Sequence, residues 1–179
     1  MEIIRADDDL GRSTALTLLA ERREGLIVNI TSKTWCVCGS GHDYKRQICE
    51  ENGIEMFATH HSGGTIVVFP GDLSLYAIQR ERNKLGKRIT ERVRQYLLDD
   101  GINAVIKGND VMADGKKVCS YGSSVVNGLL ETVVHVSINS DVELIRKICS
   151  KEMIKMPGAL SDYGITAQDV WGAVADICV

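Results

Sequence analysis

The chain has 179 residues, of which 44% are hydrophobic and 25% are charged, and its net charge is −3. This length and composition are typical of one globular domain with its own hydrophobic core. Lysine and arginine are scattered along the chain rather than clustered, which argues against a nucleic-acid-binding protein. No apolar run approaches about 20 residues and no secretory signal opens the chain, so we expect a cytoplasmic protein with no membrane partner.

The hydrophobic pattern predicts five helices separated by short strands. Helices are expected at residues 10–23, 43–51, 86–100, 141–151 and from a capping-box sequence at 166–169 onward. We expect Gly25 to end the first of them. Strands are expected at residues 26–30, 34–38, 66–69, 73–78, 102–107 and 129–138, with a hairpin at 111–118. This order predicts an α/β protein of the α+β type, with one domain over 1–179 and a mixed, largely antiparallel sheet flanked by helices.

The six cysteines are expected to be reduced thiols, because the chain shows no secretory signal. Cys36 and Cys38 are separated by one residue, whereas a pair of metal ligands usually has two to four residues between them and a second pair elsewhere. A structural metal site is therefore not expected. His42 and His135 are interpreted as ordinary structural residues.

Three segments, taken in chain order, carry a more specific pattern. Residues 62–73 place Ser-Gly-Gly-Thr before an apolar strand and a Pro-Gly-Asp turn. Residues 109–122 place Asn-Asp before a hairpin whose second strand carries Lys117 and reaches Gly122. The strand at 128–139 and a tail at 157–165 follow. This arrangement resembles the superfamily of lipoate–protein ligases, octanoyltransferases and biotin–protein ligases over about residues 10–170.

The resemblance implies a class II synthetase or biotin-ligase-like catalytic core. Because 179 residues leave little room beyond that core, we expect no C-terminal accessory domain of the kind that many lipoate ligases carry. The resemblance further implies a lipoate–protein ligase-like enzyme that uses ATP and Mg²⁺ to activate lipoate or octanoate as an acyl-adenylate. A lysine of a lipoyl carrier domain then receives the acyl group. Lys117 is the expected catalytic residue, and Asp110 the expected Mg²⁺ ligand. The expected substrate-binding and cofactor-binding residues are Ser62, Gly63, Gly64, Thr65, Asn109, Asp110 and Gly122.

Physical chemistry is compatible with these roles. A glycine pair lets backbone N–H groups approach an anion or an acyl tail closely. An ammonium group held on a strand stabilises charge that develops during acyl transfer. Asn109-Asp110 also fits ordinary turn chemistry, and Gly63-Gly64 also fits a flexible turn, so both interpretations stay open.

Two alternatives remain. An octanoyltransferase would take its acyl group from acyl carrier protein without ATP, using Lys117 and a thiolate at Cys149. Cys149 also fits a buried core position on the expected helix at 141–151. The second alternative is a non-catalytic module that binds a cofactor or a carrier. It is suggested by Thr59, His60 and His61, which stand where the resemblance leads us to expect arginine.

Overall fold

Two β-sheets form the framework of the computed structural model, which describes residues 2–7, 10–39, 45–58, 64–80, 84–149 and 155–178. The large sheet contains, in spatial order, β1 (Ile3–Asp7), β2 (Gly25–Ile30), β6 (Leu73–Gln79), β10 (Leu129–Val136), β9 (Lys116–Val126), β8 (Asp110–Ala113) and β7 (Ala104–Lys107). The small sheet contains β4 (Glu55–Ala58), β3 (Trp35–Cys38) and β5 (Thr65–Val68). Each sheet has one parallel pair, β1 with β2 and β3 with β4, and its other pairs are antiparallel. The predicted mixed, largely antiparallel α+β fold is confirmed.

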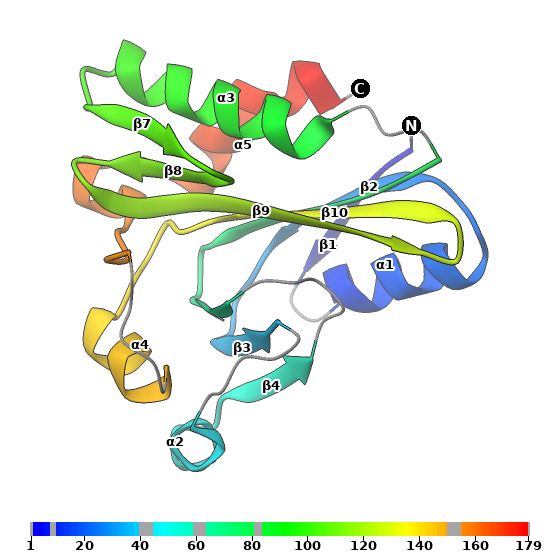
Figure 1. Ribbon diagram of the computed structural model, residues 1–179, viewed down its shortest axis with the longest axis horizontal. Coiled ribbons are helices and arrows are strands. Elements are labelled where there is room, and N and C mark those ends of the chain that lie inside the picture. Colours follow the sequence, from blue (N-terminus) through cyan, green and yellow to red (C-terminus); the bar gives the residue numbers. More distant parts are fainter. Residues whose placement is uncertain are drawn as a thin grey trace.

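Helices lie on both faces of the large sheet and beside the small sheet. They are α1 (Leu10–Ala20), α2 (Arg46–Glu51), α3 (Leu85–Asp99), α4 (Val142–Ile148) and α5 (Ala167–Cys178), with a 3₁₀ turn at Leu160–Tyr163. Figure 1 shows α3 and α5 together on one face, while α1 and the small sheet lie on the opposite side. The two faces of the large sheet therefore have different coverings. One packs against α3 and α5, and the other faces α1 and the small sheet.

The core follows this division. One hydrophobic cluster joins α3 and α5 to the large sheet and includes Ile89, Val93, Val170 and Val174. A second cluster packs α1 against the opposite face, and a third fills the small sheet beneath α2 and α4. No helix within the described residues is long and apolar enough to cross a membrane.

Several local signals have the predicted geometry. Asp114 and Gly115 both adopt positive φ, at 46° and 82°, as a tight hairpin turn requires. Thr166 and Asp169 form a reciprocal capping box, because the backbone N–H of each residue donates to the side chain of the other. The helix expected at 141–151 begins at Val142, and Asp141, which was not predicted as a cap, caps it by accepting a hydrogen bond from the Leu144 N–H.

Other boundaries differ from the prediction. The first helix ends at Ala20, and Arg22, with φ of 54°, supplies the left-handed residue expected from Gly25. Gly25 instead begins β2, where a Cβ would lie 2.7 Å from the Leu18 side chain. Strands β1 and β4 were not predicted, since neither has a strong alternating pattern and each is fixed by pairing with a distant strand.

Candidate functional site

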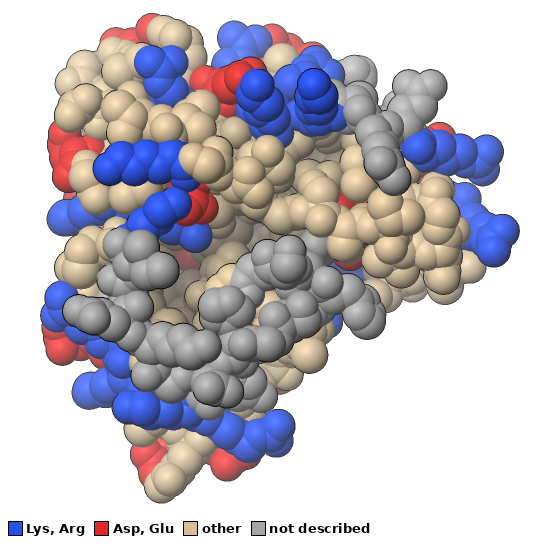
Figure 2. Space-filling model, in the orientation of Figure 1, with Lys and Arg blue, Asp and Glu red and all other residues tan. Residues whose placement is uncertain are grey.

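A cavity of about 410 Å³ lies between the two sheets. One wall is largely apolar and comes from α1 and the small sheet; its members include Leu16, Trp35, Val37, Ile66 and Val68. The facing wall belongs to the large sheet and carries most of the polar groups. Figure 2 shows the molecule hollowed between its upper and lower parts, with charged side chains gathered at the left-hand end of the hollow.

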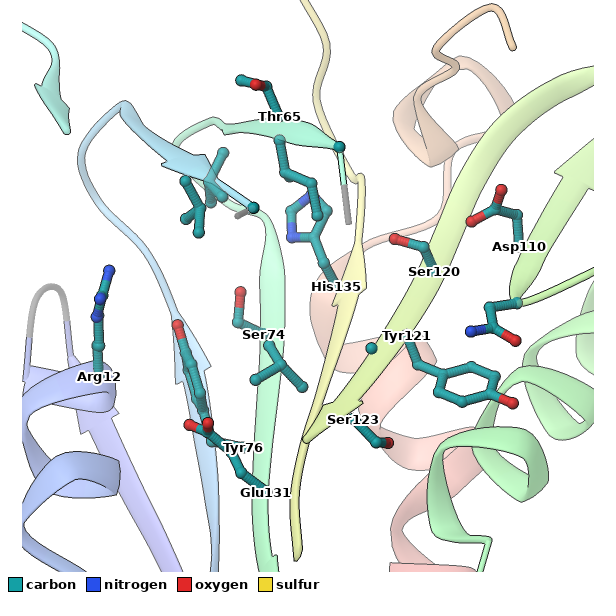
Figure 3. Close-up of a pocket in the computed structure, with 18 of the residues that line it drawn as sticks. Arg12, Thr65, Ser74, Tyr76, Asp110, Ser120, Tyr121, Ser123, Glu131 and His135 are labelled. Carbon is teal, nitrogen blue, oxygen red and sulfur yellow. The ribbon is translucent and has the colours of Figure 1, made fainter. Parts of the chain in front are cut away.

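A row of polar residues crosses the cavity face of the large sheet. The strand register places Asn29 opposite Ser74, Ser74 opposite His135, His135 opposite Ser120, and Ser120 opposite Asp110. The first four are buried, with exposures of 6% or less. A buried polar row is costly unless its groups are hydrogen-bonded, so its presence in the centre of a sheet indicates a binding surface. Figure 3 shows its members Ser74, His135, Ser120 and Asp110 around the cavity.

Lys117 reaches this face because of a β-bulge in β9. Cys119 pairs with Val111 and Lys117 pairs with Met112, so Val118 is an extra residue on β9. Both Val118 and Cys119 are buried in the core on the helical side. Without the bulge, regular alternation would place Lys117 on the same face as Cys119, the helical side. The extra residue therefore places Lys117 on the cavity side.

Asp110 is held between two ammonium groups. Its Oδ1 lies 3.1 Å from the Lys117 Nζ, and its Oδ2 accepts a hydrogen bond from the Lys155 Nζ. Because each carboxylate oxygen already faces a cation, the carboxylate is a poor ligand for Mg²⁺ in this arrangement. No cluster of three His, Cys, Asp or Glu side chains that could hold a metal is found among the described residues. These residues therefore do not fit the expected Mg²⁺ site at Asp110.

His135 is a buried, neutral group on the same wall. Burial and the nearby Lys117 ammonium lower its pKa to about 3. Its Nε2 lies 3.3 Å from the Ser137 hydroxyl and 3.5 Å from the Asp72 carboxylate. Since the imidazole is neutral at neutral pH, its contact with Asp72 is not a true ion pair. The Nδ1 atom has no hydrogen-bond partner within the described part of the chain.

Asp72 fixes the turn behind this histidine. Its buried carboxylate accepts hydrogen bonds from the backbone N–H groups of Phe69, Ile138 and Asn139, at 2.9, 2.7 and 2.9 Å. Burial raises its pKa to about 7 despite those three hydrogen bonds. Asp72 thus ties the predicted Pro-Gly-Asp turn to the end of β10, close to His135.

Arg12 lies at the opposite side of the cavity from Asp110 (Figure 3). Its guanidinium group donates to the Ala58 carbonyl oxygen and stacks 4.8 Å from the centre of the Phe57 ring. Burial lowers the pKa of Arg12, although Tyr76 and Glu131 oppose that effect. These contacts join α1 to the small sheet, so Arg12 helps to close this end of the cavity.

Six residues expected from the sequence line the cavity together: Gly64, Thr65, Asn109, Asp110, Lys117 and Gly122. Ser62 and Gly63 lie outside the described residues, as do Thr59, His60, His61 and His42. Cys149 is not a lining residue; it is half-buried at the end of α4, and burial followed by the nearby Cys38 and Cys49 raises its pKa. Its basic neighbours do not produce the lowered thiol pKa that a nucleophile needs.

Sequence reasoning missed Lys155, His135 and Arg12 as members of the site or its surroundings. Lys155 lies just before the expected tail at 157–165, and His135 lies inside the expected strand at 128–139, but the family pattern gave neither residue a role. The alternation of β10 was a usable signal, because it places Glu131, Val133 and His135 on one face.

The fold and the site together define an α+β protein with a cavity of about 410 Å³ between two sheets and a lysine on its polar wall. Residues 30–167 match the family model described as the lipoyl protein ligase A/B catalytic domain. This chain belongs to that family. The resemblance inferred from the sequence is confirmed.

Solved structures agree with this assignment at the level of fold. A bi-partite lipoate protein ligase from Thermoplasma acidophilum, studied with its E2 lipoyl domain, has a TM-score of 0.77 and 14% identity, covering 98% of this chain and 80% of that one. P. falciparum LipL1 in complex with lipoate has a TM-score of 0.79 and 13% identity, covering 98% and 60%. Lipoate-protein ligase A bound with ATP has a TM-score of 0.75 and 15% identity, covering 97% and 81%. No curated protein matches the sequence.

Proposed function

We propose that this chain is a lipoate–protein ligase-like enzyme that joins a lipoyl or octanoyl group to a lysine of a carrier domain. The observation that carries the proposal is the position of Lys117. A bulge turns its ammonium group toward a cavity whose other wall is apolar. An acid with a hydrocarbon tail would place its tail against that wall and its carboxyl group near Lys117.

The dimensions of the cavity support this class of substrate. Its volume of about 410 Å³ falls in the range of roughly 300–1,000 Å³ that is usual for small-molecule sites. Trp35, Ile66 and Val68 supply apolar contact area for an eight-carbon chain. The Lys117 ammonium would stabilise negative charge on the acyl oxygen as the carbon is attacked.

The proposed reaction has two steps. The carboxylate of the acid attacks the α-phosphorus of ATP, pyrophosphate leaves, and an acyl-adenylate forms. The amine of the carrier lysine then attacks the acyl carbon, AMP leaves, and a proton is released as the amide forms. The binding of ATP and of lipoate by similarly folded proteins supports this sequence. The lipoyl domain studied with the Thermoplasma ligase supports a lipoyl carrier domain as the acceptor.

The octanoyltransferase alternative receives less support from the site. It needs a competent thiolate beside Lys117, whereas Cys149 is absent from the cavity lining and has a raised pKa. Acyl transfer without ATP is nevertheless a distinct outcome that one experiment can separate from ligation.

The test is intact-mass analysis of an apo lipoyl domain after parallel reactions with the purified chain. One reaction holds octanoate or lipoate with ATP and Mg²⁺, a second holds octanoyl-loaded acyl carrier protein without ATP, and a third holds synthetic octanoyl-adenylate. Acylation in the first and third reactions supports the ligase. Acylation in the third alone supports the transfer step and places adenylation on another protein. Acylation in the second alone, abolished by Cys149→Ala, would replace the ligase with the transferase. Failure of all three would favour a binding module without catalysis.

A further inference from the structure

Lys155 is not itself a lining residue of the cavity, but its ammonium group contacts Asp110, which lines the polar end. Its Nζ donates to the Asp110 carboxylate and, at 3.1 Å, to the Lys107 carbonyl oxygen. Its side chain is 32% exposed, close to the 33% of Lys117, whereas that of Asp110 is only 14% exposed. Two partly exposed cations therefore flank one largely buried carboxylate.

The backbone holds Lys155 in a fixed place relative to Lys117. The N–H of Lys117 donates to the Met156 carbonyl oxygen at 2.7 Å, and the N–H of Gly158 donates to the Lys117 carbonyl oxygen at 2.8 Å. Pro157, between them, pairs with Lys117 as a parallel bridge. The two lysines thus come from segments that are hydrogen-bonded directly to each other, although 37 positions separate 117 from 155 in the sequence.

A close backbone approach makes this arrangement possible. A Cβ added at Gly158 would lie 2.7 Å from the Lys116 Cβ and 3.1 Å from the Val118 Cγ1. The segment at 155–158 therefore packs directly on the bulged part of β9. This packing fixes the backbone at Lys155 and so places its side chain beside Asp110.

The charges at this end of the cavity favour an anion. Asp110 neutralises one of the two ammonium groups, so the trio of Asp110, Lys117 and Lys155 has a net charge of about +1. An ammonium group has three N–H donors. The Lys155 ammonium group donates one hydrogen to Asp110 and one to the Lys107 carbonyl oxygen. The Lys117 ammonium group directs one hydrogen toward Asp110. Counting contacts among the described residues only, each lysine thus keeps at least one donor for an incoming oxygen anion. His135 adds no charge here because its pKa is lowered.

We propose that Lys155 is a phosphate-binding residue of this site. Together with Lys117 it would hold the phosphate of the acyl-adenylate, while Asp110 keeps both ammonium groups in position before the ligand arrives. This inference rests on the proposed function, since a phosphate enters the site only with a nucleotide. Lys155 would supply positive charge for the adenylate that arginine was expected to supply at positions 59–61, where this chain has Thr59, His60 and His61.

The experiment compares a ligand that carries the phosphate and nucleoside of an adenylate with one whose anion is a carboxylate. Octyl-AMP, a stable ester that keeps the phosphate charge, and octanoate are each titrated into wild-type protein, Lys155→Met and Lys155→Arg by calorimetry. Lys116→Met is the matched control, because Lys116 is a neighbouring exposed lysine whose side chain faces Asp162 at 3.8 Å. A lost charge-assisted hydrogen bond is worth about 1.5–3 kcal/mol, or roughly 10- to 150-fold in affinity.

We expect Lys155→Met to weaken octyl-AMP binding at least about 10-fold while octanoate binding changes less than about threefold. Lys155→Arg should restore most of the loss, and Lys116→Met should bind both ligands like the wild type. Equal effects of Lys155→Met on both ligands would assign Lys155 a merely structural role and overturn the proposal, as would no effect on either. If Lys155→Met proves unstable, Lys155→Gln serves the same comparison. Wild-type protein that binds octanoate but not octyl-AMP would contradict the adenylate route itself.

Discussion

Lys117 and Lys116 are adjacent in the sequence but have different surroundings. Lys117 lines the cavity beside Asp110, whereas Lys116 is half-exposed and faces Asp162. Simple alternation along β9 separates the two lysines onto opposite faces. Which face receives Lys117, however, is decided by the extra residue Val118. The family pattern predicted the role of Lys117 from the sequence, but the bulge that delivers it depends on pairing with β8, a contact that no local pattern encodes.

His135 gives a pH-dependent prediction at the same scale. Its pKa is about 3 in the folded protein, against an ordinary value of 6.5. Between these values the unfolded chain binds a proton that the folded chain does not, so this group costs stability as the pH falls from 6.5. Asp72, whose pKa is raised to about 7, has the opposite effect and costs stability as the pH rises from about 4 to 7.

We therefore expect the wild-type protein to show little net pH dependence from this pair between about pH 4 and 6.5. Replacing His135 by Gln removes one of the two opposing effects. The free energy of unfolding of the wild type relative to His135→Gln should increase by about 1.6 kcal/mol between pH 5 and pH 6.5. Urea denaturation at the two pH values measures it. A difference between the two proteins that does not change with pH would show that His135 titrates normally.

At the scale of elements, the C-terminal segment at 155–158 completes the site by lying against β9. Its hydrogen bonds to Lys117 join backbone atoms. The position of the segment therefore depends more on how closely its backbone can approach β9 than on its side chains. The sequence predicted a tail at 157–165 that closes the core, but it did not predict that Lys155, just before this tail, reaches Asp110. That contact depends on the close approach at Gly158.

A pair of glycine substitutions tests this packing. Gly158→Ala introduces a Cβ 2.7 Å from the Lys116 Cβ and should destabilise the protein by about 1–3 kcal/mol. We also expect weaker binding of octyl-AMP, because Lys155 moves with the segment.

Gly172, an exposed residue in α5 with no atom within 4 Å of an added Cβ, is the matched control. Gly172→Ala should stabilise the protein by about 0.5–1 kcal/mol. Thermal and urea denaturation of both variants measure these changes. A Gly158→Ala variant as stable as Gly172→Ala would disprove the close approach.

Features that depend on neighbouring residues could be predicted from the sequence, whereas pairings between distant strands could not. The Asp114-Gly115 turn and the Thr166–Asp169 capping box were predictable because each depends on residues within a few positions. Strand β4, by contrast, has half-buried or exposed side chains and exists through its parallel pairing with β3. The division into two sheets, and hence the cavity between them, follows from such distant pairings.

At the scale of the whole molecule, the two sheets behave as the two walls of a binding site. A ligand placed between them would stabilise the folded state by about 2.7 kcal/mol at a concentration 100 times its Kd. For a domain of this size that corresponds to a rise in Tm of about 5–10 °C. We expect octanoate to produce such a rise in the wild-type protein.

Val133→Trp tests whether the cavity is responsible. Val133 lines the cavity from the centre of β10, and an indole ring there would occupy the space proposed for the acyl chain. Val125 lies in β9, the strand paired with β10, but is 56% exposed and does not line the cavity, so Val125→Trp is the control. The rise in Tm on adding octanoate should disappear in Val133→Trp and persist in Val125→Trp. An unchanged rise in Val133→Trp would place the acid elsewhere.

The rate of acyl transfer from synthetic octanoyl-adenylate to an apo lipoyl domain tests the proposed acyl-transfer site directly. This reaction bypasses adenylation, so its rate reports on the acyl-transfer step and not on the use of ATP. Removing one group that stabilises developing charge typically costs about 10²–10³ in rate. We predict that Lys117→Ala loses transfer by about this factor while Lys116→Ala stays within about twofold of the wild type. Equal rates for Lys117→Ala and the wild type, or no transfer above the uncatalysed background, would contradict an acyl-transfer site in this cavity.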